Sequence, residues 1–248
     1  MKALIVFCIL PGSMACSPTY IDATGLAPTT LGTGLVAHWT FDEIGGDMLA
    51  DDSGNRRDGS VQGATFRNDG RFGGALHFLP GDSVTVEKFP SATSSWTFSG
   101  WVRVGEEDVV SEDFGTIITT EAMQVGGWQF QTRARSSGIY WTFAYWLGSG
   151  INYAHFDCHC FELGRWSHAT VVVDGARNQL SSYVDGQRAE VSSLPAPILP
   201  GTSTLSMGTW SGAGRLFSGS IDDVAIYDRA LQPAEVTALE AAPAPRPK

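Results

Sequence analysis

Short segments rich in β-branched and aromatic residues recur along most of the chain, and turn residues separate them at short, regular intervals. This spacing is typical of a β-sandwich or a β-barrel, in which antiparallel strands follow one another through tight turns. The 29 glycines and 12 prolines supply the turns. We therefore predict an all-β fold, with strands over 35–41, 75–79, 83–89, 96–104, 115–120, 127–134, 139–147, 168–174, 179–185, 203–210 and 217–228.

One segment near the C-terminus, 231–242, has a helical pattern instead. Pro233 stands where a helix begins, Glu235 lies in the first turn, and Val236 and Leu239 share one side. We predict a short C-terminal helix there. The simplest division of the chain is one domain over 34–241, followed by a Pro-rich tail over 242–248.

The N-terminus has the pattern of an export signal. One lysine precedes an apolar run too short to anchor the chain in a bilayer, which predicts a signal peptide over 1–15 and a tether over 16–33. Two processing routes stay open, because Cys16 after Ala15 resembles a bacterial lipobox with a lipidated cysteine, while Ser13 and Ala15 also suit an ordinary signal peptidase. We expect an outer-membrane or cell-surface lipoprotein, otherwise a periplasmic or secreted protein. We expect the protein to contact the membrane only through a lipid attached to Cys16.

The net charge limits the class of partner, and the cysteine content limits the kind of metal site. The net charge of -10 disfavours a nucleic-acid partner, because binding phosphates needs a basic face. Of the four cysteines, Cys158 and Cys160 are the two that lie beyond the signal peptide and its junction. A zinc site usually draws ligand pairs from two segments, and the sequence has no second Cys/His cluster. We expect a local disulfide or two free thiols.

The order of several motifs points to a family. The segment "LVAHWTFDE" (35–43) is followed by "DDSGNRRDG" (51–59), "GRFGGALHF" (70–78), "WTFSGWVRV" (96–104), "GRWSHATVVVDG" (164–175), "LSSYVDGQ" (180–187) and "SGSIDDVAIYDRALQPAEV" (218–236). This series resembles the LamG-like jelly-roll domains of the concanavalin A-like lectin/glucanase superfamily. The resemblance implies two antiparallel sheets in a jelly-roll sandwich, a binding or adhesion role, and often one structural calcium ion.

The same resemblance suggests where calcium would lie, because it places the N-terminal loop beside the closing strand. Calcium prefers six to eight oxygen ligands from carboxylates, carbonyls and Asn. The predicted ligands are Asp42, Asp51, the Gly54 carbonyl, Asn55 and Asp222, with Asp52 and Asp223 as substitutes. The alternative is that Asp51 and Asn55 only cap a turn, and that Asp222 accepts hydrogen bonds from loop N–H groups.

The adjacent residues Asp222 and Asp223 interrupt an apolar strand pattern. In a regular strand they point to opposite faces, with Asp222 on the side of Val224 and Ile226. We expect Asp222 to contribute to the ion site, and Asp223 to face solvent or to make a hydrogen bond at the strand end.

Aromatic residues concentrate over 137–156. Trp141, Phe143 and Tyr145 share one strand face, while Tyr140 and Trp146 share the other with Thr142 and Ala144. One set must face the core, and the other either stacks on sugar rings or is buried beneath a loop. The predicted ligand-binding residues are Tyr140, Trp146, Tyr153, Trp128 and Trp210.

Catalysis has little support in the sequence. Laminarinase-type relatives carry closely spaced carboxylates along one strand, but Glu106, Asp108 and Glu112 have one residue too many and suit a solvated loop. His168, on the strand face of Trp166, is expected to be a hydrogen-bonded core residue. We expect a non-catalytic module that binds a carbohydrate or an extracellular protein, with calcium. The alternatives are a glycoside hydrolase or lyase with an atypical site and a structural adhesion module.

Overall fold

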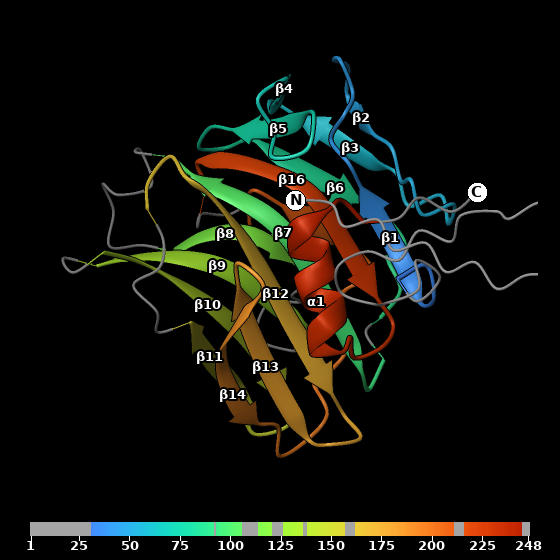
Figure 1. Ribbon diagram of the computed structural model, residues 1–248, viewed down its shortest axis with the longest axis vertical. Helices are drawn as coiled ribbons and strands as arrows, with labels where there is room; N and C mark the ends of the chain where they lie inside the picture. The colour runs from blue at the N-terminus through green and yellow to red at the C-terminus, as the bar shows by residue number, and fades with distance from the viewer. Residues whose placement is uncertain are drawn as a thin grey trace, which may run out of the picture.

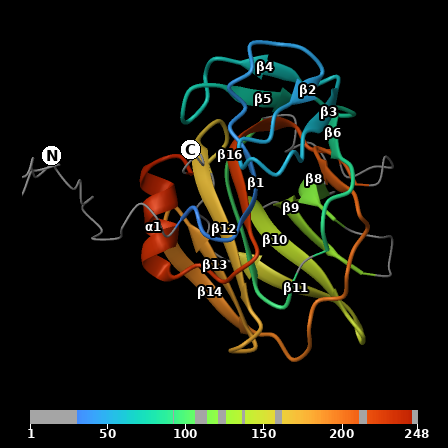
Figure 2. The same ribbon diagram turned by 90° about the vertical axis from the view of Figure 1, so that its right-hand side faces the viewer.

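The computed structural model describes residues 31–91, 93–105, 114–120, 126–135, 138–156, 162–210 and 216–244. These residues form two antiparallel sheets that face each other, with one helix outside (Figures 1 and 2). The predicted all-β sandwich with a short C-terminal helix is confirmed. In the described part of the chain no helix is long and apolar enough to cross a membrane.

The first sheet, sheet A, has the strand order β14-β13-β12-β7-β16-β5-β4, and β1 pairs with the closing strand β16. Its three longest strands, β7, β12 and β16, are neighbours in the middle of the sheet. The strands are β1 (Leu35–Trp39), β4 (Thr65–Arg67), β5 (Ala75–Phe78), β7 (Trp96–Val104), β12 (Trp166–Asp174), β13 (Gln179–Val184), β14 (Gln187–Ser193) and β16 (Gly219–Tyr227).

The second sheet, sheet B, has the order β11-β10-β9-β8-β15-β6-β3-β2. Its three longest strands are β9, β10 and β11, which pair in sequence order. The strands are β2 (Met48–Leu49), β3 (Gly59–Gln62), β6 (Ser83–Val86), β8 (Phe114–Thr119), β9 (Trp128–Arg135), β10 (Gly138–Leu147), β11 (Gly150–Phe156) and β15 (Leu205–Met207).

The core lies between the sheets, where the apolar residues of alternating strands meet. Trp39, Phe98, Phe130 and Phe143 are among its fully buried side chains. Aromatic rings of the two sheets pack against each other, since the ring of Phe98 in β7 lies 5.3 Å from the ring of Phe130 in β9. Alternation of side chains along each strand therefore selects one face for the core, as the sequence pattern predicts.

The helix α1 (Pro233–Ala241) covers the face of sheet A that points away from sheet B, here called the outer face (Figure 2). Val236 and Leu239 pack with Tyr183 and Tyr227 in a second apolar cluster beneath it. The backbone N–H of Gln232 donates to Glu235 Oε2 (2.8 Å), and Arg229 holds the same carboxylate through both of its terminal nitrogens. These contacts fix the start of the helix.

Candidate functional site

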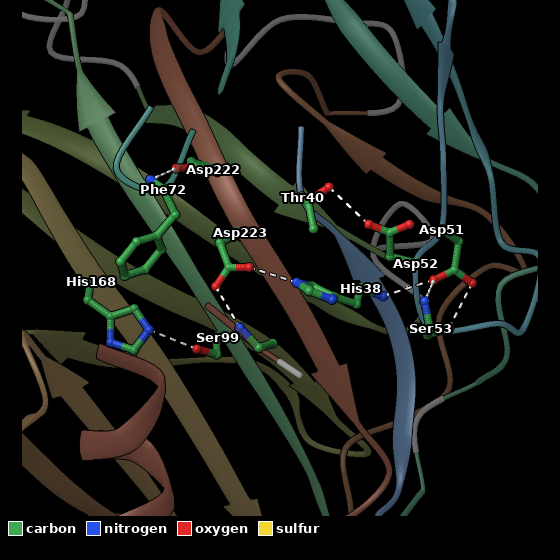
Figure 3. Close-up of polar contacts among 11 residues, drawn as sticks. His38, Thr40, Asp51, Asp52, Ser53, Phe72, Ser99, His168, Asp222 and Asp223 are labelled. Carbon is green, nitrogen blue, oxygen red and sulfur yellow. Dashed lines mark hydrogen bonds and ion pairs between the residues drawn. The ribbon is translucent and has the colours of Figure 1, made fainter. Parts of the chain in front are cut away.

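The predicted ligands Asp51 and Asn55 hold a turn against β1. Asp51 Oδ1 accepts from the backbone N–H groups of His38 (3.0 Å) and Ser53 (2.9 Å), and Oδ2 accepts from the Arg57 N–H (2.9 Å). Asn55 Nδ2 donates to carbonyl oxygens of β1. Figure 3 shows Asp51 turned toward His38 and Ser53. These are the contacts expected of the turn-capping alternative.

A β-bulge in β16 changes the geometry expected of the two aspartates. The register with β7 shifts between Asp222 and Ala225, and Asp223 has a φ of 44°. Ile221 and Val224 both lie in the core between the sheets, although a regular strand would place them on opposite faces. Asp222 and Asp223 therefore both lie on the outer face, and the prediction that they point to opposite faces is wrong.

Asp222 is buried beneath the loop that precedes β5. Its Oδ2 accepts from the backbone N–H of Phe72 (2.8 Å), while Oδ1 has no hydrogen-bond partner among the described residues. Burial raises the pKa of Asp222 to about 7, with a smaller contribution from the charge of Asp223, although the Phe72 and Arg71 N–H groups favour the carboxylate. Asp42 contacts the same loop, since its Oδ1 accepts from the Gly74 N–H (2.8 Å).

Asp223 does not face solvent, which was one of the two alternatives that the sequence left open, but is buried and hydrogen-bonded. Only 4% of its surface is accessible, and it sits between β1 and the segment that follows α1. Its Oδ1 lies 2.7 Å from His38 Nε2, and its Oδ2 accepts from the Ala244 N–H (3.1 Å). Asp223 thus joins the first strand, the closing strand and the C-terminal segment (Figure 3).

The fold does not gather the predicted calcium ligands around one point. Asp51 and Asn55 serve the turn at β1, whereas Asp42 and Asp222 contact the loop over 70–74. Within the described ranges, no three His, Cys, Asp or Glu side chains are placed to share a metal ion. An ion in this region would have to rely on Asp42, Asp222 and carbonyl oxygens of the loop, without Asp51 or Asn55.

His168 lies on the outer face and is almost fully buried, as expected of a structural histidine. Its Nε2 is 2.8 Å from Ser99 Oγ, and its ring packs 5.1 Å from the ring of Trp101. Burial, and to a lesser extent the positive charge of Arg71, lowers the pKa of His168 to about 3. The imidazole is therefore neutral throughout the physiological range.

The aromatic residues of β10 divide between two faces as the sequence pattern predicts. Trp141, Phe143 and Tyr145 join the core, so strand alternation places Tyr140 and Trp146 on the opposite face of sheet B, here called the sugar face. Tyr153 of β11 pairs with Ala144 and lies on the same face. Tyr153 is 42% exposed, Tyr140 is half-buried and Trp146 is buried at 5%.

Two polar residues of the sugar face were not among the predicted site residues. Gln131 of β9 pairs with Thr142 of β10, and both are buried. Neither the Gln131 amide nor Thr142 Oγ1 has a hydrogen-bond partner within the described part of the chain. An unsatisfied buried group costs about 1–3 kcal/mol. The signal was present in "WQFQ" (128–131), where the glutamines alternate with core aromatics.

The other two predicted ligand-binding tryptophans do not lie with this group. Trp128 is 2% exposed and belongs to the core, where its ring stacks 4.8 Å from Trp96 and 5.9 Å from Phe143. Trp128 also lines a pocket of about 180 Å³. Trp210 is half-buried and lies just beyond β15, which pairs with β6 and β8 and not with β9–β11. A stacking role for Trp128 on the sugar face is therefore wrong.

Several predicted features lie outside the described residues. They are the signal peptide and most of the tether, the lipidation residue Cys16, the carboxylates Glu106, Asp108 and Glu112, and the thiols Cys158 and Cys160.

Comparison with solved structures finds the same sandwich fold in several other proteins. The ligand-binding domain of botulinum neurotoxin serotype D, in complex with N-acetylneuraminic acid, is 16% identical with a TM-score of 0.68, covering 86% of this chain and 52% of that one. The binding domain of Paraclostridial Mosquitocidal Protein 1 is 20% identical with a TM-score of 0.66, covering 85% and 52%. The chain thus spans about half the length of these toxin domains.

Another similar structure matches almost end to end. Domain 4 of AbnA, a GH43 extracellular arabinanase from Geobacillus stearothermophilus, in complex with arabinotriose, is 19% identical with a TM-score of 0.64, covering 83% of this chain and 98% of that one. No curated protein sequence matches the chain. The family model described as the concanavalin A-like lectin/glucanases superfamily matches residues 80–237. Because this match spans more than half of the chain and the fold agrees with it, the chain belongs to the concanavalin A-like lectin/glucanase superfamily.

Proposed function

We propose that the chain is a non-catalytic carbohydrate-binding module whose ligand contacts the sugar face. One observation carries this proposal: Tyr140, Trp146 and Tyr153 share a sheet face with the unsatisfied polar groups of Gln131 and Thr142. Aromatic rings stack on the apolar faces of sugars, and a few fixed polar groups orient the hydroxyls.

The polar pair has the hydrogen-bonding capacity that a sugar needs. The Gln131 amide offers two donors and an acceptor, and the Thr142 hydroxyl offers one donor and two acceptor sites. Both side chains are buried, so a sugar hydroxyl, which both donates and accepts, would reach them only if the atoms that cover them moved aside. Tyr153 is the most exposed of the three aromatic residues and would meet the ligand first.

The similar structures support a binding role over a catalytic one. Two of them are named as complexes with a saccharide, N-acetylneuraminic acid in one and arabinotriose in the other. The toxin structures are described as binding domains. Because their identity to this chain is below 25%, they support the class of ligand and not a particular sugar.

Export and calcium form a second part of the proposal. We propose that the domain is displayed outside the cytoplasm, with Cys16 as the lipid attachment residue, and that calcium binds near the loop over 70–74. Support for the ion comes from Asp222, whose buried Oδ1 lacks a partner among the described residues, and from Asp42, which accepts a hydrogen bond from the same loop. A hard cation at Asp222 would offset the unfavourable burial of its charge.

A glycan array, followed by calorimetric titration of the best ligand, tests the binding role. We expect Tyr153→Ala to weaken binding about two- to twelvefold, because stacking on one ring is worth about 0.5–1.5 kcal/mol. Val191→Ala is the matched control, since Val191 is equally exposed at 42% but lies on β14 of sheet A. Binding of no glycan, with an extracellular protein bound instead, would favour the adhesion alternative. Release of shortened saccharides would identify an enzyme.

A further inference from the structure

A groove on the outer face of sheet A gathers basic side chains in an otherwise acidic protein. It has a volume of about 280 Å³ and crosses the neighbouring strands β7, β16, β5 and β4. The chain carries a net charge of -10, yet this groove contains two arginines and a histidine. The polar residues that line it are Arg67, His77, Arg103 and Ser220.

Strand register places the polar side chains in one row. Ser220 of β16 pairs with Arg103 of β7 on one side and with His77 of β5 on the other. His77 in turn pairs with Thr65 of β4, and Arg67 follows two residues later on the same face. The basic groups are therefore positioned by three adjacent strand pairings of the sheet.

Hydrogen bonds and stacking hold this row in place. Arg103 Nη2 donates to Ser220 Oγ (3.3 Å), which also lies 3.2 Å from His77 Nδ1. The Arg103 guanidinium lies 4.8 Å from the ring of Trp166 and forms an ion pair with Asp69 (2.7 Å). A guanidinium fixed in this way loses little conformational entropy when it binds an anion.

The charges leave the groove positive. Asp69 balances Arg103, but no carboxylate is among the residues that line the groove. Arg67 therefore adds a positive charge there, although it also lines a second pocket with Asp42, Glu43 and Asp69. Arginine presents donors in a fork that matches the oxygens of a carboxylate or a sulfate. A net positive groove on an acidic surface would concentrate anions locally.

We propose that this groove is an oxyanion-binding subsite that takes the carboxylate or sulfate group of an acidic saccharide. The saccharide part of this statement rests on the proposed function, whereas the anion part rests on Arg67, Arg103, His77 and Ser220 alone. The groove lies on sheet A and the sugar face lies on sheet B, so this is a second site.

Calorimetric titration with three probes tests the subsite: trigalacturonate, its neutral methyl ester, and a sulfated galactose trisaccharide. We expect Arg67→Gln to weaken binding of at least one acidic probe about tenfold. Asp69→Asn should strengthen it, because it removes the competing carboxylate. The methyl ester should respond to neither variant. Arg177→Gln is the control for the loss of one arginine charge, since Arg177 pairs with Asp174 and is not among the residues that line the groove.

The outcomes separate this subsite from the proposed function. One outcome is that neutral glycans bind through Tyr153 while the affinity for the acidic probes is unchanged by the Arg67 and Asp69 substitutions. That result would overturn the subsite alone. Another outcome is that binding of the acidic probes depends on Arg67 while no neutral glycan binds. That result would support the subsite and refute glycan binding at the sugar face. Failure of both acidic probes to bind would also overturn the subsite. Thermal melting of each variant verifies that it is folded.

Discussion

Replacing Asp222 by Asn is the substitution whose effect the structure defines most clearly. Asp222 is buried on the bulge of β16, accepts one hydrogen bond from the Phe72 N–H, and has a pKa of about 7 because of burial. Asn has the same shape, keeps an oxygen for the Phe72 N–H and carries no charge. The substitution therefore removes the buried charge with little change in packing.

The magnitude follows from the pKa difference between the two states. In the unfolded chain the carboxyl group has the ordinary value of 3.8, against about 7 in the fold. Below pH 3.8 both states are protonated, and the group has no effect on stability. As the pH rises from 3.8 to 7 the unfolded chain releases a proton that the fold retains, so stability falls, by up to about 4 kcal/mol above pH 7.

Urea unfolding in a chelator at pH 4, 6 and 8, followed by tryptophan fluorescence, measures this effect. We expect Asp222→Asn to match the unsubstituted chain at pH 4 and to exceed it in stability at pH 8. The difference between the two proteins isolates Asp222, because other groups titrate equally in both. Equal differences at pH 4 and pH 8, or a variant less stable at pH 8, would refute the reasoning.

The same variant tests the proposed ion. If calcium binds at Asp222, adding it at pH 8 stabilises the unsubstituted chain, because a ligand that binds only the folded state must do so. The Asp222→Asn variant should respond much less. A chain whose melting temperature is unchanged by calcium and by chelator would refute the calcium proposal.

Three further predictions concern the supporting structure. Asp223→Ala should lower the free energy of unfolding by about 1–3 kcal/mol in urea, because it leaves the buried His38 Nε2 and the Ala244 N–H without their acceptor. His168 has a pKa of about 3 in the fold, so NMR should show no titration of its ring from pH 5 to 8. Because the unfolded chain takes up a proton at this histidine that the fold does not, His168 should reduce stability as the pH falls from about 6.5 toward 3. Trp128→Ala should cost about 3–5 kcal/mol of stability while the folded fraction keeps its affinity for glycans, since Trp128 is a core residue.

The overall fold was predictable because its signals are local. Alternation along 139–147 correctly assigns Trp141, Phe143 and Tyr145 to one face, and the structure places all three in the core. Pro233 and Glu235 mark the start of the helix in the sequence, and the helix begins there. Such patterns depend only on neighbours in the chain, so one sequence is enough to detect them.

The bulge in β16 shows why the site was harder to predict. One inserted residue reverses the face of every side chain before it relative to those after it, and the pattern "IDDVAI" is compatible with either geometry. His38 and Asp223 are 185 residues apart in sequence, and only the pairing of β1 with β16 brings them together. The arginines of the groove likewise meet through strand register.

The glutamines of β9 were missed for a different reason. Polar residues in a strand usually face solvent, so the alternation of Gln129 and Gln131 with core aromatics was visible in the sequence but did not mark these glutamines as buried. Their significance lies in their burial, and in the absence of a partner for the Gln131 amide among the described residues. Burial depends on tertiary packing, which one sequence does not reveal.

Amide hydrogen exchange, measured with and without the saccharide that binds best in the array, tests the proposed location of the site most directly. The account predicts slower exchange in β9, β10 and β11, the strands that carry Gln131, Thr142 and Tyr153. The strands beneath α1 should be unaffected by a neutral saccharide. Protection confined to the loop over 70–74 or to the outer face of sheet A, with β9–β11 unchanged, would contradict it.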